Sequence, residues 1–263
     1  MSDNINIAAK KLLQSYDSGI PIKAIRSLLP DDDIKAAYAV QKLNTDHWVT
    51  HGREPIGHKI GLTSKSVQNQ LGVDQPDFGI LYSDMAISEH EEIRTAQVMQ
   101  PKVEAEIAFV LEKDLNQKKY TIADIINAVA YILPAIEIVG SRIEAWDINI
   151  VDTIADNASS GLFVLGNSPK QINDIDMRLC GMVMERRGEQ VSLGAGQACL
   201  GNPLNAVVWL ANKMAEFEQP LIAGDIILSG ALGPMVTASP GDIFEARISG
   251  LGSVTASFAN GDK

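Results

Sequence analysis

The stretch Lys102-Val103-Glu104-Ala105-Glu106-Ile107-Ala108-Phe109-Val110-Leu111 decides how the rest of the chain is interpreted. Its apolar end predicts a buried β-strand, and the side chains of a strand alternate between its two faces. Glu104 and Glu106 are therefore expected on the same face, beside a hydrophobic segment. Two carboxylates at this spacing repel each other, so in a water-poor site they need a proton, a cation or residual water.

A third acid interrupts a second apolar run, Tyr131-Ile132-Leu133-Pro134-Ala135-Ile136-Glu137-Ile138-Val139. A lone carboxylate in such a run rarely serves solubility. Glu137 could pair with the nearby Arg142, or it could join Glu104 and Glu106. Three carboxylates without Cys or His nearby favour a hard cation, Mg²⁺ or Mn²⁺, over Zn²⁺. The alternative for Glu-x-Glu is an ordinary solvent-facing strand.

Two further residues are candidates for proton transfer. Lys59 lies in a glycine-flanked segment that predicts a strand, and Asp77 lies in a loop rich in turn-forming residues. Partial desolvation is expected to shift the pKa values of both towards neutrality. A solvated lysine and an aspartate that merely stabilises a turn are the alternatives.

Other polar motifs carry weaker signals. The loop 156–161 could hold a substrate oxygen, with Ser160 as the candidate contact, or it could be a plain turn. The glycine-rich segment 194–199 lacks the third glycine of a dinucleotide-binding loop, so we expect an ordinary loop with Cys199 in the core. No Gly-x-Ser-x-Gly motif is present, which leaves serine hydrolysis without a visible nucleophile.

Composition narrows the classes of function. The chain has 263 residues, 46% of them hydrophobic, and a net charge of −11, which argues against nucleic-acid or anionic-membrane partners. The first residues do not resemble a secretory signal, and no apolar stretch approaches the roughly 20 residues needed to span a bilayer. Two cysteines suggest a reducing compartment. These features predict a cytoplasmic protein.

The hydrophobic pattern predicts an α+β fold. Residues 1–54 have helical spacing and should form an N-terminal helical region, packed on a catalytic domain at 55–263 within a single folding unit. The closely spaced strands of the last third favour an antiparallel or mixed sheet folded on itself. Expected elements include a helix from Thr63 to Leu71, a capped helix from Thr121, a hairpin turning at Arg187-Gly188, a helix from Pro203 to Met214, and strands at 225–228, 235–238, 243–248 and 253–258.

Several separated motifs, in order along nearly the whole chain, together resemble one family. They are Gly57-His58-Lys59-Ile60-Gly61-Leu62-Thr63, Asp74-Gln75-Pro76-Asp77-Phe78-Gly79, Glu104-Ala105-Glu106, Leu133-Pro134-Ala135-Ile136-Glu137 and Ala155-Asp156-Asn157-Ala158-Ser159. The chain resembles the 2-keto-4-pentenoate (2-hydroxypenta-2,4-dienoate) hydratases of the fumarylacetoacetate hydrolase superfamily.

This resemblance implies a mixed β-sheet roll, and Mg²⁺ or Mn²⁺ held by Glu104, Glu106 and Glu137. It also implies a pentamer-based homo-oligomer, a small 2-hydroxy or 2-oxo dienoic acid as substrate, and a place in meta-cleavage degradation of aromatic compounds, with a pathway enzyme as a possible partner. Lys59 and Asp77 would transfer protons, with their roles as acid and base left open. The alternatives are a 4-oxalocrotonate decarboxylase, an acylpyruvate hydrolase and a non-catalytic partner subunit.

Overall fold

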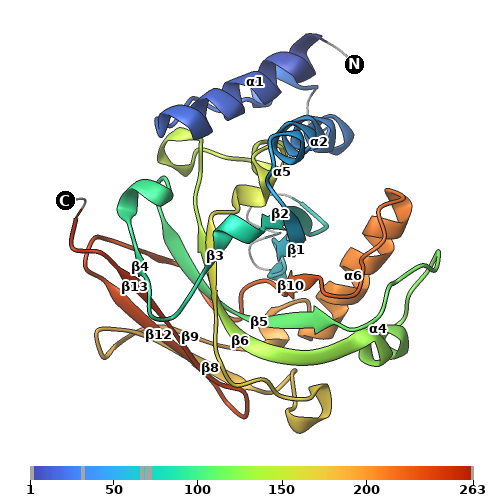
Figure 1. Ribbon diagram of the computed structural model, residues 1–263, viewed down its shortest axis with the longest axis vertical. Coiled ribbons are helices and arrows are strands. Elements are labelled where there is room, and N and C mark those ends of the chain that lie inside the picture. The colour runs from blue at the N-terminus through green and yellow to red at the C-terminus, as the bar shows by residue number, and fades with distance from the viewer. Residues whose placement is uncertain (1–2, 31–32, 66–67, 69–72, 262–263) are drawn as a thin grey trace.

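The fold consists of two curled β-sheets, with helices at one end and along one side of them (Figure 1). The computed structural model describes residues 3–30, 33–65, 68 and 73–261. The helices are α1 (Asp3–Ser18), α2 (Ile34–Thr50), α4 (Ile122–Ala128), α5 (Ile150–Ala155) and α6 (Pro203–Glu216). The expected helix from Thr63 to Leu71 lies largely outside the described residues.

The larger sheet has eight strands in the order β2-β1-β10-β5-β6-β7-β3, with β11 also paired to β5. Two of its pairs, β1 with β10 and β3 with β7, are parallel and the others are antiparallel. Its strands are β1 (Pro55–Gly61), β2 (Asp77–Tyr82), β3 (Ala86–Ile87), β5 (Lys102–Leu111), β6 (Val129–Val139), β7 (Leu162–Leu165), β10 (Ile226–Leu228) and β11 (Val236–Thr237). The predicted mixed sheet is therefore confirmed, with the Glu-x-Glu strand at its centre.

The smaller sheet has five strands in the order β4-β13-β12-β8-β9. They are β4 (Glu92–Ile93), β8 (Gly181–Arg186), β9 (Glu189–Ala195), β12 (Ile243–Ile248) and β13 (Gly252–Phe258). The predicted hairpin is present, because Arg187 and Gly188 connect β8 and β9 with φ values of 51° and 85°. Positive φ at both central residues is typical of the tight turns that match strand twist. Long strand β6 packs against β12 and β13, which joins the two sheets through one core.

The N-terminal helices form a second, smaller core with α5. Helix α2 begins after Asp33, whose side chain accepts a hydrogen bond from the Ala36 backbone N–H at 2.9 Å and so caps the helix. Figure 1 shows α1, α2 and α5 gathered at one end of the molecule, away from α4 and α6. The division at residue 54 into a helical region and a catalytic domain stays a prediction. Among the helices described, none is long and apolar enough to cross a membrane.

Candidate active site

Three carboxylates converge on one face of the larger sheet. Glu104 and Glu106 share a face of β5, and Glu104 lies directly opposite Glu137 of β6. One carboxylate oxygen from each residue lies within 4.8 Å of the others. Glu106 and Glu137 are 0% and 1% exposed, whereas Glu104 is partly exposed. The alternative of a solvent-facing Glu-x-Glu strand is wrong, and the acids expected to act together do meet.

The carboxylate cluster is short of hydrogen-bond donors. Glu106 Oε2 accepts a bond of 2.8 Å from the Gly230 backbone N–H, but Glu106 Oε1 and both Glu137 oxygens have no hydrogen-bond partner among the described residues. Burial raises the pKa of Glu137 to about 7, and burial with the neighbouring Glu137 and Glu104 raises that of Glu106 well above its usual range. Buried oxygens without partners are rare in folded proteins, and an all-oxygen set fits a hard divalent cation.

Lys59 lies beside this cluster. Its strand, β1, is paired on both sides, with β2 and β10, and the side chain is 3% exposed. The ammonium Nζ lies 3.2 Å from Glu137 Oε1 and donates a hydrogen bond of 2.9 Å to the Ala158 carbonyl. The solvated-lysine alternative is therefore wrong, and so is the pairing of Glu137 with Arg142.

The charge state of Lys59 also differs from the expectation. Burial by itself lowers the pKa of a lysine, but Glu137, Asp77 and the other acids raise it more, and the pKa of Lys59 lies above its usual value. The expected shift towards neutrality is wrong for this group. It is right in direction for Asp77, whose pKa is raised by burial.

Asp77 is the first residue of β2, opposite Gly61 of β1, and is 1% exposed. The Thr153 hydroxyl donates a long hydrogen bond of 3.4 Å to Asp77 Oδ2, while Oδ1 has no hydrogen-bond partner among the residues described. A β-carbon on Gly61 would lie 2.2 Å from Asp77 Oδ1 and 3.6 Å from Lys59 Nζ, so only glycine leaves room for this arrangement. Asp77 is thus buried in a strand beside Lys59 and not in an exposed turn, and its role in proton transfer stays a prediction.

The loop after α5 supports Lys59 through an unusual backbone. Asn157, Ala158 and Ser159 have φ values of 54°, 51° and 55°, a left-handed conformation that non-glycine residues rarely adopt. The Asn157 side chain accepts from the Ile80 N–H and donates to the Ile80 carbonyl, which fixes the loop against β2. This places the Ala158 carbonyl where Lys59 can bind it.

Ser160 follows in the same loop and is 1% exposed. Its hydroxyl donates a hydrogen bond of 2.8 Å to the Asn157 carbonyl, so the group is held by the backbone of its own loop. Its expected contact with substrate stays a prediction.

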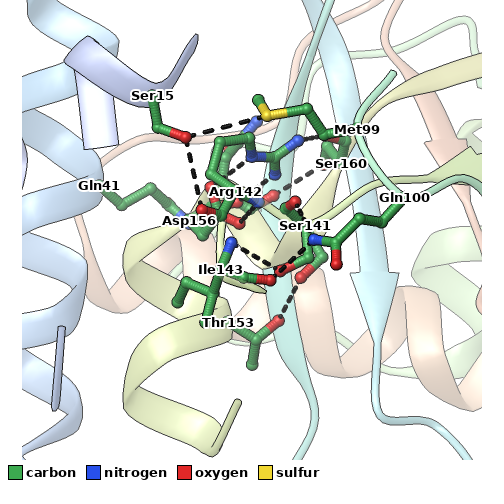
Figure 2. A network of polar contacts seen from close by, with 12 residues as sticks. Ser15, Gln41, Met99, Gln100, Ser141, Arg142, Ile143, Thr153, Asp156 and Ser160 are labelled. Carbon is green, nitrogen blue, oxygen red and sulfur yellow. Dashed lines mark hydrogen bonds and ion pairs between the residues drawn. The ribbon is translucent and has the colours of Figure 1, made fainter. Parts of the chain in front are cut away.

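A buried ion pair holds this loop from its other side (Figure 2). Arg142 Nε donates to Asp156 Oδ1 at 2.6 Å, and the Arg142 backbone N–H donates to Oδ2 at 3.0 Å. The two terminal nitrogens of Arg142 donate to the carbonyls of Ser160 and Asp156, each at 2.9 Å. The ring of Tyr16, from α1, lies 4.4 Å from the guanidinium carbon. Arg142 therefore connects the N-terminal helices to the loop that supports Lys59.

Sequence reasoning missed these supporting residues. Asp156 lies within one of the motifs that carried the family resemblance, but its spacing from Arg142 gave no sign of a contact. Thr153 belongs to α5, where its hydroxyl could equally have bonded the helix itself. Cys199 is buried and donates to the Ser229 carbonyl, as expected for a core residue.

A cavity of about 440 Å³ reaches the carboxylate cluster at Glu104. Its lining is mostly apolar, and two of its lining residues, Leu193 and Met235, are 58% and 43% exposed. The volume is within the usual range for small-molecule sites. The lining residues are Ile60, Gly61, Leu62, Thr63, Ser64, Glu104, Leu193, Gly194, Ala198, Ala231, Leu232, Gly233, Pro234 and Met235.

Comparison with known proteins gives concordant matches. The profile described as fumarylacetoacetate (FAA) hydrolase C-terminal matches residues 56–259. The protein named TodF product hydratase from Pseudomonas putida F1 is 58% identical over 252 residues, which cover 96% of this chain and 94% of that protein. The 2-keto-4-pentenoate hydratase of Paraburkholderia xenovorans LB400 is 54% identical over 251 residues, covering 95% and 93%.

A solved structure matches the whole fold. The 4-oxalocrotonate decarboxylase of Pseudomonas putida G7, in complex with magnesium and adipate, has a TM-score of 0.93 at 33% sequence identity, with 98% of both chains covered. The two hydratases are thus more similar in sequence to this chain than the decarboxylase is.

Proposed function

This chain belongs to the fumarylacetoacetate hydrolase family, and from that membership we propose that it is a metal-dependent hydratase. It adds water to 2-hydroxypenta-2,4-dienoate, also written as 2-oxopent-4-enoate, and forms 4-hydroxy-2-oxopentanoate in meta-cleavage degradation of aromatic compounds. The observation that carries the assignment is that relatives of 54–58% identity over nearly the whole chain are named as hydratases, and that all three glutamates meet in this chain.

Glu104, Glu106 and Glu137 would hold Mg²⁺ or Mn²⁺. The Glu106 and Glu137 oxygens that accept no hydrogen bond from the described residues, and the all-carboxylate donor set, fit such an ion. When bound, the cation supplies Lewis-acid stabilisation of charge that develops on the C2 oxygen of the substrate.

Lys59 and Asp77 are proposed to move the protons. The reaction requires one proton to be delivered to C5 and one to C3, while the C2 hydroxyl and the water that adds at C4 each lose one. Lys59 is held as a cation by the surrounding acids, and Asp77 shares that field from the adjacent strand. Both groups are buried, so that bulk water does not compete with them for the substrate. We assign the two residues to proton transfer as a pair, and Ser160 to orienting the substrate.

The main competing reaction is decarboxylation of 4-oxalocrotonate, which would use the same carboxylates. The test incubates the purified protein with Mg²⁺ and either 2-hydroxypenta-2,4-dienoate or 4-oxalocrotonate. We expect loss of the dienoate absorbance with formation of 4-hydroxy-2-oxopentanoate, and no release of CO₂. Release of CO₂ from oxalocrotonate without hydration of the pentadienoate would overturn the assignment.

We propose a cytoplasmic homo-oligomer built on a pentamer, with a pathway enzyme as a possible partner. Light scattering of the purified protein tests the assembly, and a monomer at micromolar concentration would exclude it.

A further inference from the structure

Gln41 is a buried polar residue of α2, with a side chain that is 4% exposed. Its amide Nε2 donates a hydrogen bond of 2.9 Å to the Phe78 carbonyl of β2 and one of 3.0 Å to the Ile154 carbonyl of α5. A primary amide has two N–H donors, so both are used. In Figure 2 the Gln41 side chain points away from its helix, towards the segment that carries Asp156. One side chain of the N-terminal helical region therefore joins α2, β2 and α5.

Both carbonyls lie where secondary structure leaves backbone groups to be bonded by side chains. Strand β2 is at the edge of the larger sheet and, among the strands described, pairs with β1 alone, so alternate backbone groups face away from the sheet. Ile154 lies in the last turn of α5, where carbonyls have no partner within the helix. An unpaired buried carbonyl is unfavourable, and the Gln41 amide satisfies both.

A second side chain of α2 bonds the same residue of β2. Tyr38 lies three positions before Gln41, on the same face of the helix. The Tyr38 hydroxyl accepts a hydrogen bond of 3.3 Å from the Phe78 N–H, and the Tyr38 ring stacks on the Phe78 ring with centroids 4.7 Å apart. The N–H and the carbonyl of Phe78 are thus both held by side chains of α2.

These contacts adjoin Asp77. Phe78 follows Asp77 directly in β2, and Ile154 follows Thr153, whose hydroxyl donates the hydrogen bond of 3.4 Å to Asp77 Oδ2. The carboxylate has few restraints of its own, because Oδ1 accepts no hydrogen bond from the described residues. Its position therefore depends on the backbones of β2 and α5, which Gln41 connects.

Small displacements matter at this position. The carboxylate lies so close to β1 that a β-carbon on Gly61 would lie 2.2 Å from Asp77 Oδ1. A shift of about 1 Å in a reacting group can lower a rate by roughly a hundredfold. A side chain that fixes β2 relative to α5 is therefore in a place to control the rate.

Resting on the proposed hydratase activity, we propose that Gln41 is a positioning residue for Asp77. Its amide fixes β2 relative to α5 and so sets the Asp77 carboxylate against Thr153 and Lys59. Gln41 does not belong to the lining of the cavity at Glu104, so it acts through Asp77 and not by contact with the substrate. By this link the N-terminal helical region takes part in building the active site.

Gln41→Met tests this role with a side chain of similar length that has no N–H donor. In the presence of Mg²⁺ we expect kcat for 2-hydroxypenta-2,4-dienoate to fall by roughly ten- to a hundredfold while KM stays within about twofold, because the proposed metal ligands are untouched. Tyr38→Phe removes the longer contact and should lower kcat by about threefold, which keeps the inference testable if Gln41→Met does not fold. An unchanged kcat in both variants would refute the inference.

The matched control is Asn44→Leu. Asn44 lies on the same helix and is 2% exposed, and its Oδ1 has no hydrogen-bond partner among the described residues. The variant removes a buried amide of α2 without removing a bond to β2 or α5 that the structure describes, so kcat should stay within about twofold of the wild type. A loss of kcat as large as that in Gln41→Met would overturn the specific role of Gln41.

Hydrogen exchange separates this inference from the proposed function, because it needs no substrate. Mass spectrometry compares amide exchange in peptides that cover β2 and α5. We expect both segments to exchange about tenfold faster in Gln41→Met than in the wild type or in Asn44→Leu, while β6, at the centre of the sheet, is unchanged. Unchanged exchange in β2 and α5 would refute the inference even if the enzyme hydrates the dienoate.

Absence of hydration by the wild type would instead refute the hydratase assignment. The exchange comparison would then still decide whether Gln41 holds β2 and α5 together.

Discussion

Two buried ionic clusters of different composition contact the loop 156–160, one through the Asp156 carboxylate and the other through the Ala158 carbonyl, which accepts a hydrogen bond from Lys59. Around Arg142 and Asp156 the charges balance, and the guanidinium donates to the partner carboxylate and to two backbone carbonyls. Around Glu104, Glu106 and Glu137 the acids outnumber Lys59, and several carboxylate oxygens have no hydrogen-bond partner among the described residues.

The difference in charge balance distinguishes buried charges that stabilise a structure from buried charges that form a functional site. A balanced and fully hydrogen-bonded pair costs little once formed and fixes one geometry. An unbalanced cluster is unfavourable in the folded protein unless something else compensates it, and such groups concentrate at functional sites. The first cluster supports the loop that positions Lys59, and the second provides the proposed metal ligands.

Glu106→Gln is the most severe test of this comparison. The variant keeps the shape of the side chain but removes one of three ligands, and we expect kcat/KM to fall by roughly 10³ or more. In the presence of a chelator the same variant should be at least as stable as the wild type, because one of three repelling carboxylates is gone. Activity assays and thermal unfolding measure the two effects. Unchanged activity would remove Glu106 from the ligand set.

Asp156→Asn should lower the stability of the protein, whereas Glu106→Gln should lower its activity and leave its stability intact. It leaves the Arg142 cation buried without its counter-ion, and we expect the free energy of unfolding to fall by about 4 kcal/mol. Urea unfolding measures this loss. The double variant Arg142→Met with Asp156→Leu should recover much of it, because no buried charge is left unpaired.

The control for this experiment is an exposed ion pair. Lys42 and Asp46 lie 2.9 Å apart on α2, with side chains 61% and 56% exposed, and Lys42→Ala should cost about 0.5 kcal/mol or less. A loss in Asp156→Asn as small as that of the control would contradict a structural role for the buried pair.

The pH dependence of stability, measured on protein kept metal-free with a chelator, gives the smallest of the three effects. The pKa of Glu137 is raised from 4.5 to about 7, so between these values the folded state binds more protons than the unfolded state. Stability must therefore fall as pH rises through this window, by about 3 kcal/mol from this group. Thermal unfolding of wild type and Glu137→Gln between pH 4.5 and 7 isolates the contribution. Parallel curves for the two proteins would show that Glu137 titrates normally.

Much of this protein follows from local patterns in the sequence. The helical spacing before Gly52, the hairpin at Arg187-Gly188 and the helix from Pro203 all lie where they are expected, because periodicity and turn chemistry act over a few residues. The capped helix after Thr121 is also confirmed, since the Thr121 N–H and hydroxyl both donate to Asp124. The family and the hydratase assignment are confirmed by the relatives.

The partners of charged residues could not be predicted in the same way. Lys59 was open to a solvated alternative and Glu137 to a pairing with Arg142, and both alternatives are wrong. Lys59 lies on β1 and Glu137 on β6, and β10 and β5 lie between these strands in the sheet. Their contact therefore follows neither from closeness in the sequence nor from direct strand pairing.

The sequence by itself determined that three acids lie in or beside buried strands, since alternation along a strand and the rarity of acids in apolar runs are local properties. Only the tertiary structure decided that the acids face one another, that Lys59 joins them and that an apolar cavity opens at Glu104. The physical reason is that strand order and register bring together residues far apart in the chain. Interactions between sequence neighbours do not determine which distant residues come into contact.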